Sequence, residues 1–593
     1  MSIEVFNFNI LKRYIYPLFL LSVAYVLFLS SDAKVIIAGV AVFLIGMVFM
    51  EDGFKLFSGG ILERILKVST SSVPKAIGTG FVATAIVQSS SLISIIIISF
   101  LSAELITLSG AIGVVFGSNI GTTTTAWIVS AFGVKIKIAQ LAMPMLIFGV
   151  LFRFNKNKSY QGLGNVLIGL GFVFLGIGYM KEGFEALKGG LDLAQFAMEG
   201  YLGVLVYVLI GAIATIVMQS SSATMALIIT ALVTNQIVYL NALELAIGAN
   251  IGTTVTAVIG SLTSNANGKR LAVAHLIFNM VTGFIAIVLL YQLADLVTFI
   301  SSKIGIASDD YAMQLALFHT IFNIIGVLAV SPFTPKLVVF LKGLFEEKVK
   351  DVSRARYLDN AVVEVPEVAL LALKKEIMHL YDNATEALSH ALSLHRHTYI
   401  GLGDEISKAI ESSVVMIDLD IDEFYERKIK TLYGDIINYA TISQETMSVE
   451  DKHKIYSLKI ACRDIVETIK DVKELQKNIN RFMDSKNEHI KGEYNYLREE
   501  IARTLDGIHT LRNNSDDLEV LVKIKLLEEN LNKLDMIKSG RIDNLIRNNS
   551  IETKMATSLI NDSIFAYEIS KNLIHVATVL WIEDREIQEL GEE

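Results

Sequence analysis

The sequence has few of the residues that cross-link a soluble fold or interrupt its helices. It contains one cysteine, Cys462, in 593 residues, which excludes a disulfide framework and a cysteine-based zinc site. The last of the six prolines is Pro366, so no proline interrupts a helix between residue 367 and residue 593. The sequence offers no basic face for a nucleic acid. It also has no nucleotide-binding loop and no nucleophile elbow, and we therefore expect no enzyme.

Charge is scarce in the first part of the chain. Residues 1–345 hold 19 Lys and Arg against 14 Asp and Glu, whereas residues 346–593 hold 33 against 47. About 10% of the first part and about 32% of the second part is therefore charged, the contrast expected between a membrane body and a solvated domain. We predict a membrane domain over 1–345, a linker over 346–365 and a soluble helical domain over 366–593.

A membrane helix needs roughly 20 apolar residues. Several segments qualify, and two of them, 76–108 and 201–239, are long and interrupted by polar clusters. Interrupted segments at matching positions of two halves indicate broken helices or re-entrant hairpins, which line a site in transporters. The first apolar run lacks a signal-peptide cleavage site. Lys12 and Arg13 precede that run and favour a cytoplasmic N-terminus.

The membrane part contains a duplication. Gly80–Ala126 aligns with Gly211–Ala257 at an offset of 131 residues without a gap, and 20 of the 47 positions are identical. A shorter match at an offset of 130 pairs Met50–Gly60 with Met180–Gly190. The longer match superimposes two polar motifs at one fixed spacing, which low complexity would not preserve. We predict repeat one over about 35–154, repeat two over about 162–293 and a further segment over 312–345.

The duplicated motifs are neutral and polar. The first is Gln88-Ser89-Ser90-Ser91, which pairs with Gln219-Ser220-Ser221-Ser222. The second includes Asn119, Thr122 and Thr123, which pair with Asn250, Thr253 and Thr254. Three consecutive serines point around most of a helical turn, so an unwound turn or a helix end would be needed to aim them at one point. Close helix packing explains scattered small residues, but it does not explain Gln followed by three serines twice.

Two His-x-x-x-Asn pairs follow these motifs. His275 with Asn279, and His319 with Asn323, each lie four residues apart on one helical face. We interpret these pairs as interhelical hydrogen bonds inside the bundle. Lining of a permeation path is the alternative.

Two Gln-Ser-Ser-Ser motifs in duplicated halves resemble the sodium–phosphate cotransporter family, type II in animals and its bacterial relatives. The resemblance covers roughly residues 35–345. It implies an all-α polytopic membrane protein with two inverted repeats, each contributing a re-entrant hairpin. It also implies that inorganic phosphate and sodium bind at the eight motif residues, with the Asn and Thr residues named above as secondary candidates. The expected location is the bacterial inner membrane.

Sodium is the expected coupling ion because the motifs carry no Lys or Arg to balance phosphate. Moving an anion inward against an inside-negative membrane potential costs about 2.3 kcal/mol per charge per 100 mV. Cations transported with the anion would offset this cost. The direction of transport, uptake or export, stays open. A membrane-bound phosphate sensor or scaffold is the alternative function, although duplicated intact motifs favour transport.

The soluble half has helical periodicity and resembles the PhoU-like domain fused to bacterial members of that family, a helical bundle. The resemblance implies a cytoplasmic regulatory domain with a protein partner. It also implies acidic metal motifs, which Asp418 with Asp422 and Glu467 with Asp471 match in spacing. Carboxylates four residues apart lie on one helical face, as a shared cation requires. The alternative is a solvated acidic face, and Glu568-x-x-x-Asn572 lacks the closing Asp.

Overall fold

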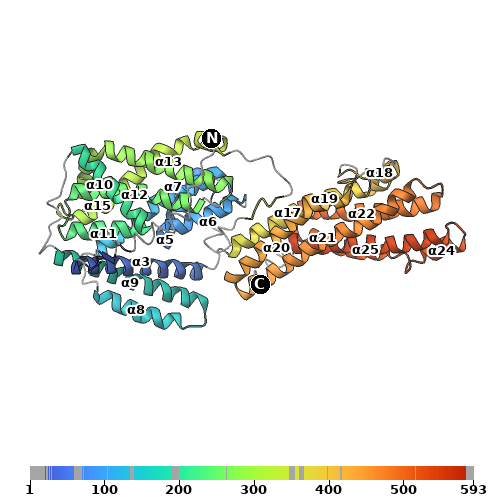
Figure 1. The fold of residues 1–593 in the computed structure, drawn as a ribbon, viewed down its shortest axis with the longest axis horizontal. Coiled ribbons are helices and arrows are strands. Elements are labelled where there is room, and N and C mark those ends of the chain that lie inside the picture. Colours follow the sequence, from blue (N-terminus) through green and yellow to red (C-terminus); the bar gives the residue numbers. More distant parts are fainter. Residues whose placement is uncertain are drawn as a thin grey trace. The chain divides into compact units, whose positions relative to one another are not determined.

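The computed structural model is helical, and its described residues contain no strand (Figure 1). It describes 21, 24, 25, 27, 28, 30–58, 70, 72–102, 104–133, 139–187, 200–261, 264–345, 354–358, 366–396, 399–413, 417, 419–514 and 516–582. The chain divides into two compact units, Met1–Glu346 and Glu347–Glu593. Most of the predicted linker lies outside the described residues, and so does most of the apolar run before residue 31.

The first unit is built from long apolar helices. They are α3 (Ser31–Ser58), α5 (Val73–Val87), α6 (Ser90–Ser102), α7 (Leu108–Ile128), α8 (Ala139–Arg153), α9 (Lys158–Leu187), α10 (Gly200–Met218), α11 (Ser221–Val233), α12 (Tyr239–Ser261), α13 (Ala266–Val288), α14 (Leu290–Ile304), α15 (Tyr311–Val330) and α16 (Thr334–Leu344). A π-turn, η2 (Val129–Gly133), follows α7, and a 3₁₀ turn, η4 (Ser331–Phe333), follows α15. Within the described residues, six stretches are long and apolar enough to cross a membrane.

The predicted long segment 76–108 folds as a hairpin of α5 and α6. Gly110 at the start of α7 lies against the backbone of Thr70, whereas Gly121 lies against Thr84 near the end of α5. Helices α5 and α7 therefore run parallel, and α6 between them must run back. With 15 and 13 residues, the arms are roughly 20 Å long, too short for a hydrocarbon core of about 30 Å.

Segment 201–239 repeats this arrangement with α10, α11 and α12. Gly211 of α10 packs against Leu245 of α12, and Gly252 packs against Ala212 and Thr215. These contacts make α10 and α12 parallel, so α11 returns between them. The two interrupted segments thus form matching hairpins, as their polar clusters predicted.

The helices that precede each hairpin, α3 and α9, pack against each other. Gly39 lies against the carbonyl oxygen of Gly176, and Gly46 lies against that of Gly169. At the 130-residue offset of the repeat, Gly39 corresponds to Gly169 and Gly46 corresponds to Gly176. Each of the two contacts therefore joins one residue to the repeat counterpart of the other contact's residue. As the residue number of the contact increases along α3, the number of its partner decreases along α9. The two equivalent helices are therefore antiparallel.

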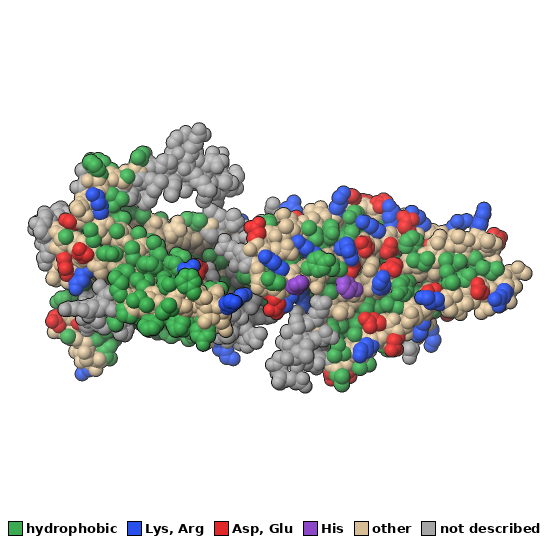
Figure 2. Space-filling model, turned by 90° about the horizontal axis from the view of Figure 1, so that it is seen from below, with side chains coloured by type: hydrophobic (Ala, Val, Ile, Leu, Met, Phe, Trp, Pro, Cys, Tyr) green, Lys and Arg blue, Asp and Glu red, His purple; other side chains and the backbone are tan. Residues whose placement is uncertain are grey.

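The face of the first unit seen in Figure 2 carries a broad patch of hydrophobic side chains. Large side chains such as Leu202, Leu209, Phe284 and Leu328 are exposed on its helices. Exposed apolar area of this extent is unfavourable in water and typical of contact with lipid. Together with the apolar stretches, it identifies this unit as the membrane part of a membrane protein.

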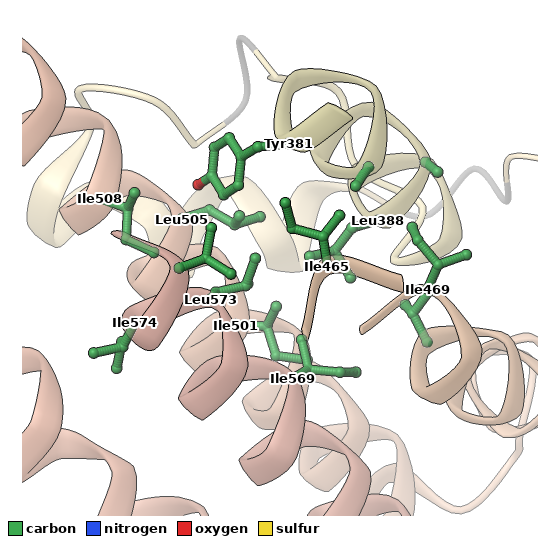
Figure 3. Packing of buried hydrophobic residues seen from close by; sticks show 14 of the residues in the cluster. Tyr381, Leu388, Ile465, Ile469, Ile501, Leu505, Ile508, Ile569, Leu573 and Ile574 are labelled. Carbon is green, nitrogen blue, oxygen red and sulfur yellow. The ribbon is translucent and has the colours of Figure 1, made fainter. Parts of the chain in front are cut away.

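The second unit is a bundle of long helices. They are α17 (Pro366–Ala391), α18 (Ile406–Ser412), α19 (Ile421–Phe424), α20 (Thr431–Ser443), α21 (Val449–Met483), α22 (Glu488–Asn513), α23 (Asp517–Leu531), α24 (Arg541–Arg547) and α25 (Thr553–Trp581). Short turns η7 (Gly403–Glu405), η9 (Gln444–Thr446) and η10 (Asn532–Leu534) and the π-turn η8 (Tyr425–Lys430) join them. Leu388, Ile465, Ile501 and Leu573 meet in the core, one each from α17, α21, α22 and α25 (Figure 3). On the face seen in Figure 2, positive and negative side chains are scattered over this unit.

Candidate substrate-binding site

Each hairpin turns at a glutamine in the left-handed region of backbone conformation. Helix α5 ends at Gln88, with φ 60°, and α10 is followed by Gln219, with φ 52°. A residue with a side chain adopts this conformation at a cost of about 1–3 kcal/mol, and such strain clusters at functional sites. The break frees the serines that follow from the geometry of a continuous helix.

The serine after each glutamine caps the returning helix. Ser89 Oγ accepts the Leu92 N–H of α6 at 3.2 Å, and Ser220 Oγ accepts the Ala223 N–H of α11 at 3.1 Å. Two helix N-termini therefore start at the two hairpin tips. Their free N–H groups and dipoles favour negative charge.

Both hairpin tips line one cavity of about 190 Å³. Its walls come from the two serine motifs, from α3 and from the ends of α10 and α12. The lining residues are Leu44, Met47, Val48, Glu51, Gln88, Ser89, Ser90, Ser91, Thr215, Met218, Gln219, Ser220, Ser221, Ser222, Thr253 and Thr256. All eight motif residues predicted from the sequence are thus brought together, although the motifs are 131 residues apart.

A hydroxyl of α7 connects the two repeats at the cavity. Gln88 Nε2 donates to Thr124 Oγ1 at 2.9 Å, and Gln88 Oε1 accepts from Thr125 Oγ1 at 2.8 Å. Thr125 Oγ1 also lies 3.2 Å from Ser222 Oγ of the second hairpin. This chain of hydrogen bonds couples the tip of one hairpin to the serine cluster of the other.

The two glutamines differ in their surroundings. Gln88 is buried against α7, whereas Gln219 is exposed where it lines the cavity. At the offset of 131 residues, Val255 of α12 corresponds to Thr124 of α7. Helix α12 therefore has no counterpart of one of the two threonine hydroxyls that bond to Gln88. The two hairpins are therefore in unequal positions, one tip docked on its partner helix and the other open.

The secondary candidates divide into two groups. Thr253 lines the cavity and accepts a hydrogen bond from Asn279 Nδ2 at 3.3 Å. The other five are not among the described residues that line the cavity. Their side chains donate hydrogen bonds within or between helices: Asn119 to Val115 O, Thr122 to Asn119 O, Thr123 to Ile120 O, Asn250 to Asn279 Oδ1 and Thr254 to Ile251 O. Asn119 Nδ2 also lies 3.4 Å from His275 Nε2, so the His275–Asn279 pair of α13 binds both repeats.

Sequence reasoning missed some residues of the site. Thr125 and Thr256 lie inside the aligned repeat, three positions beyond Thr122 and Thr253, and their identity in both copies was an available signal. Glu51 of α3 was also missed. Its signal was a charged residue directly after a long apolar run.

The acidic pairs of the second unit occupy ordinary surroundings. Asp422 bonds to Lys473 Nζ at 2.7 Å, and Glu467 lies 3.6 Å from Arg463. Burial, with Glu568 and Glu467 nearby, raises the pKa of Asp471 to about 6. Asp418 lies outside the described residues. Within the described part of the chain, no group of three or more such side chains is arranged to hold a metal.

Five curated proteins resemble the chain, and four of them are named YjbB. The "Putative inorganic phosphate export protein YjbB" of Escherichia coli K12 is 28% identical over 368 residues, 61% of this chain and 65% of the relative. Its namesake in Salmonella typhimurium is 27% identical over the same length. "Uncharacterized protein YqeW" of Bacillus subtilis is 28% identical over 298 residues, 49% of this chain and 91% of the relative.

The match to the YjbB proteins thus spans just under two thirds of their own length. No solved structure matches the chain. Residues 42–182 and 193–316 match the model of the Na⁺/Pi-cotransporter family, and these ranges contain both hairpins and every residue that lines the cavity. Over 265 of its 593 residues, all of them in the membrane unit, the chain is therefore similar to the Na⁺/Pi-cotransporter family.

Proposed function

We propose that this protein carries inorganic phosphate together with sodium across the bacterial inner membrane, through the cavity between the two hairpin tips. The observation that carries the proposal is that both Gln-Ser-Ser-Ser motifs line one cavity, together with two helix N-termini. Serine hydroxyls and helix N-terminal N–H groups suit the oxygens of an anion. A cotransporter family and a site made of neutral hydroxyls both favour a carrier over an enzyme.

Sodium would supply the positive charge that the cavity lacks. No Lys or Arg occurs among the described residues that line it. Phosphate in this site would thus depend on helix dipoles and hydroxyls alone unless a cation enters with it. The same cation would help drive an anion inward against an inside-negative potential.

The direction of net transport follows from the gradients that the protein couples. The YjbB relatives are named for export, whereas an inward sodium gradient drives a symporter inward. The antiparallel contact of α3 with α9 supports an inverted relation of the two repeats, and inverted repeats permit alternating access around a fixed site. The unequal hairpins are consistent with one side of such a cycle.

The helical second unit is proposed as a PhoU-like regulatory domain in the cytoplasm, acting with a protein partner. Its support is its all-helical bundle and its acidic surface. Such a domain alters transport only through contacts that differ between the conformations of the membrane unit.

The test is flux of radiolabelled phosphate in proteoliposomes, with and without a sodium gradient of either direction. Wild-type flux should require sodium. Ser90→Ala with Ser221→Ala should abolish most of it without loss of membrane insertion, because removing a hydroxyl makes neither segment more polar. Ser302→Ala is the matched control, since Ser302 is exposed on α14 and bonds only to Phe299 O of its own helix, at 2.7 Å. Full flux from the double variant would refute the site.

A further inference from the structure

Glu51 is the one charged side chain among the described residues that line the cavity. It lies on α3, where it ends a long apolar run and is followed by Asp52 and Lys55, and its Oε2 accepts a hydrogen bond from Ser89 Oγ at 3.1 Å. Ser89 belongs to the first motif and caps α6. A carboxylate is thus joined directly to the residues proposed to bind an anion. Ionisable groups inside membrane proteins are costly and usually serve function.

The charge comes from one repeat only. At the 130-residue offset, the counterpart of Glu51 is Lys181 of α9. Lys181 is not a lining residue, and its Nζ lies 3.9 Å from Glu185 Oε1. Lys181 therefore adds no positive charge to the lining of the cavity.

A negative side chain in an anion site needs a physical reason. In a cavity of about 190 Å³ a bound phosphate would lie within several ångströms of Glu51. Like charges at that separation repel strongly, because screening inside a protein is weaker than in water. A small cation between them reverses this effect, since it attracts both. Carboxylate and hydroxyl oxygens are the ligands that hard cations prefer.

We propose that Glu51, with Ser89 Oγ, binds the sodium ion that allows phosphate to enter the cavity. This inference rests on the proposed function and adds the residue that couples the two solutes. With the cation absent, Glu51 opposes phosphate. With the cation bound, the same residue contributes to a neutralised site. Sodium dependence of phosphate affinity is therefore assigned to this side chain.

The competing explanation is structural. Glu51 could serve only to orient Ser89 and to stabilise the N-terminus of α6, where negative charge is favourable. Its neutralisation would then change phosphate affinity equally in the presence and absence of sodium. The two explanations differ in the ratio of the two affinities.

The test is calorimetric titration of phosphate into the purified full-length protein, in sodium buffer and in a buffer with a large organic cation. In Glu51→Gln, phosphate should bind about tenfold or more tightly than in wild type when sodium is absent, because a like charge is gone. The ratio of affinities between the two buffers should fall to within about twofold of one, since sodium and phosphate share one coupling energy. Asp52→Asn is the matched control. It removes the same charge from the next residue of α3, which is exposed and does not line the cavity, and it should keep the wild-type ratio.

Glu51→Asp provides a second variant should the glutamine variant not fold. It keeps the charge but withdraws it from Ser89, so sodium should bind more weakly while phosphate affinity at saturating sodium stays near that of wild type. A wild-type ratio in Glu51→Gln, or unchanged sodium affinity in Glu51→Asp, overturns the assignment of Glu51. Loss of phosphate binding in the wild type itself, in both buffers, would instead overturn the proposed function.

Discussion

Gln88 and Gln219 determine the geometry of the site through the backbone rather than through their side chains alone. Each holds a left-handed conformation between two helices, and the surrounding structure must offset the cost. Gln88 does so with hydrogen bonds to Thr124 and Thr125. Gln219 is exposed in the same structure. The cost of the left-handed conformation is thus offset more fully at Gln88 than at Gln219. A movement that brought the Gln219 side chain to Thr256 would give both hairpin tips the same kind of hydrogen bond.

At the same scale, the sequence predicted the residues that line the cavity better than it predicted their hydrogen-bond partners. The eight Gln and Ser residues are adjacent in sequence within each motif, so one pattern revealed them all. Thr125 and Glu51 reach the site from other helices, and their approach depends on how those helices pack. The secondary candidates Asn119 and Asn250 share the conserved spacing of the repeat, yet they bond to α7 and α13. Duplication marks such packing positions as strongly as it marks the positions that line the cavity.

Asp471 allows a pH-dependent prediction for the second unit. Burial, then Glu568 and Glu467, raise its pKa to about 6 in the folded protein. A raised carboxyl pKa adds stability below the unfolded pKa, and this stability is lost as pH rises through 6. Asp471→Asn should therefore stabilise the bundle at pH 7.5 by roughly 1 kcal/mol, discounted for its partial exposure, and by much less at pH 4.5.

The measurement is thermal unfolding followed by fluorescence of Trp581 on α25, in full-length protein where the second tryptophan, Trp127, is replaced by Phe. Glu450→Gln, an exposed carboxylate on the same helix, is the control and should show no comparable gain. If Glu467 and Asp471 instead bind a divalent cation, Asp471→Asn will lower the midpoint in buffer that contains that cation. That outcome would establish the metal site predicted from the acidic spacing.

At the scale of helices, close backbone contact holds each hairpin to its parallel partner. A Cβ atom on Gly117 would lie 1.9 Å from the carbonyl oxygen of Ile77, and one on Gly248 would lie 2.0 Å from that of Val208. These glycines are equivalent in the repeat. Neither contact leaves room for a methyl group, so the helices approach closely at the equivalent position of both halves.

Gly117→Ala should therefore push α5 from α7 and shift the tip at Gln88. Overpacking of a buried contact costs about 1–3 kcal/mol, and this one faces backbone that does not yield as a side chain does. We expect a lower thermal midpoint in detergent and weakened phosphate binding. Gly178→Ala on α9 is the control, because a Cβ there would meet nothing within 4 Å, and it should be neutral or slightly stabilising. Equal midpoints for the two variants would contradict the packing argument.

The interruption of the helices was predictable, whereas their pairing was not. Polar clusters within long apolar runs indicated hairpins because buried serines need partners in a bilayer. The parallel contact of α5 with α7 depends on glycines such as Gly80 and Gly117, which hydropathy treats like any other small residue. The antiparallel contact of α3 with α9 rests on Gly39 and Gly46 in the same way.

For the whole molecule, the contrast in charge between the two parts of the sequence is matched by two compact units that part between Glu346 and Glu347. Every residue that lines the cavity lies in the first unit. The family match also ends within it, at residue 316. Among the described residues, the lining of the cavity thus comes from the membrane unit.

Truncation after residue 345 tests the role of the second unit. The shortened chain keeps both hairpins, and its net charge changes from −9 to +5. Because the cavity remains whole, we expect sodium-dependent binding of phosphate with wild-type affinity. The rate of flux, or its response to phosphate on the cytoplasmic side, should change, since a regulatory domain acts through contacts that differ between transport states. Flux is measured in proteoliposomes and normalised to folded protein in the membrane. Loss of both binding and flux in a well-folded truncation would show that the bundle completes the transport machinery, and identical kinetics with and without it would exclude a regulatory role in this assay.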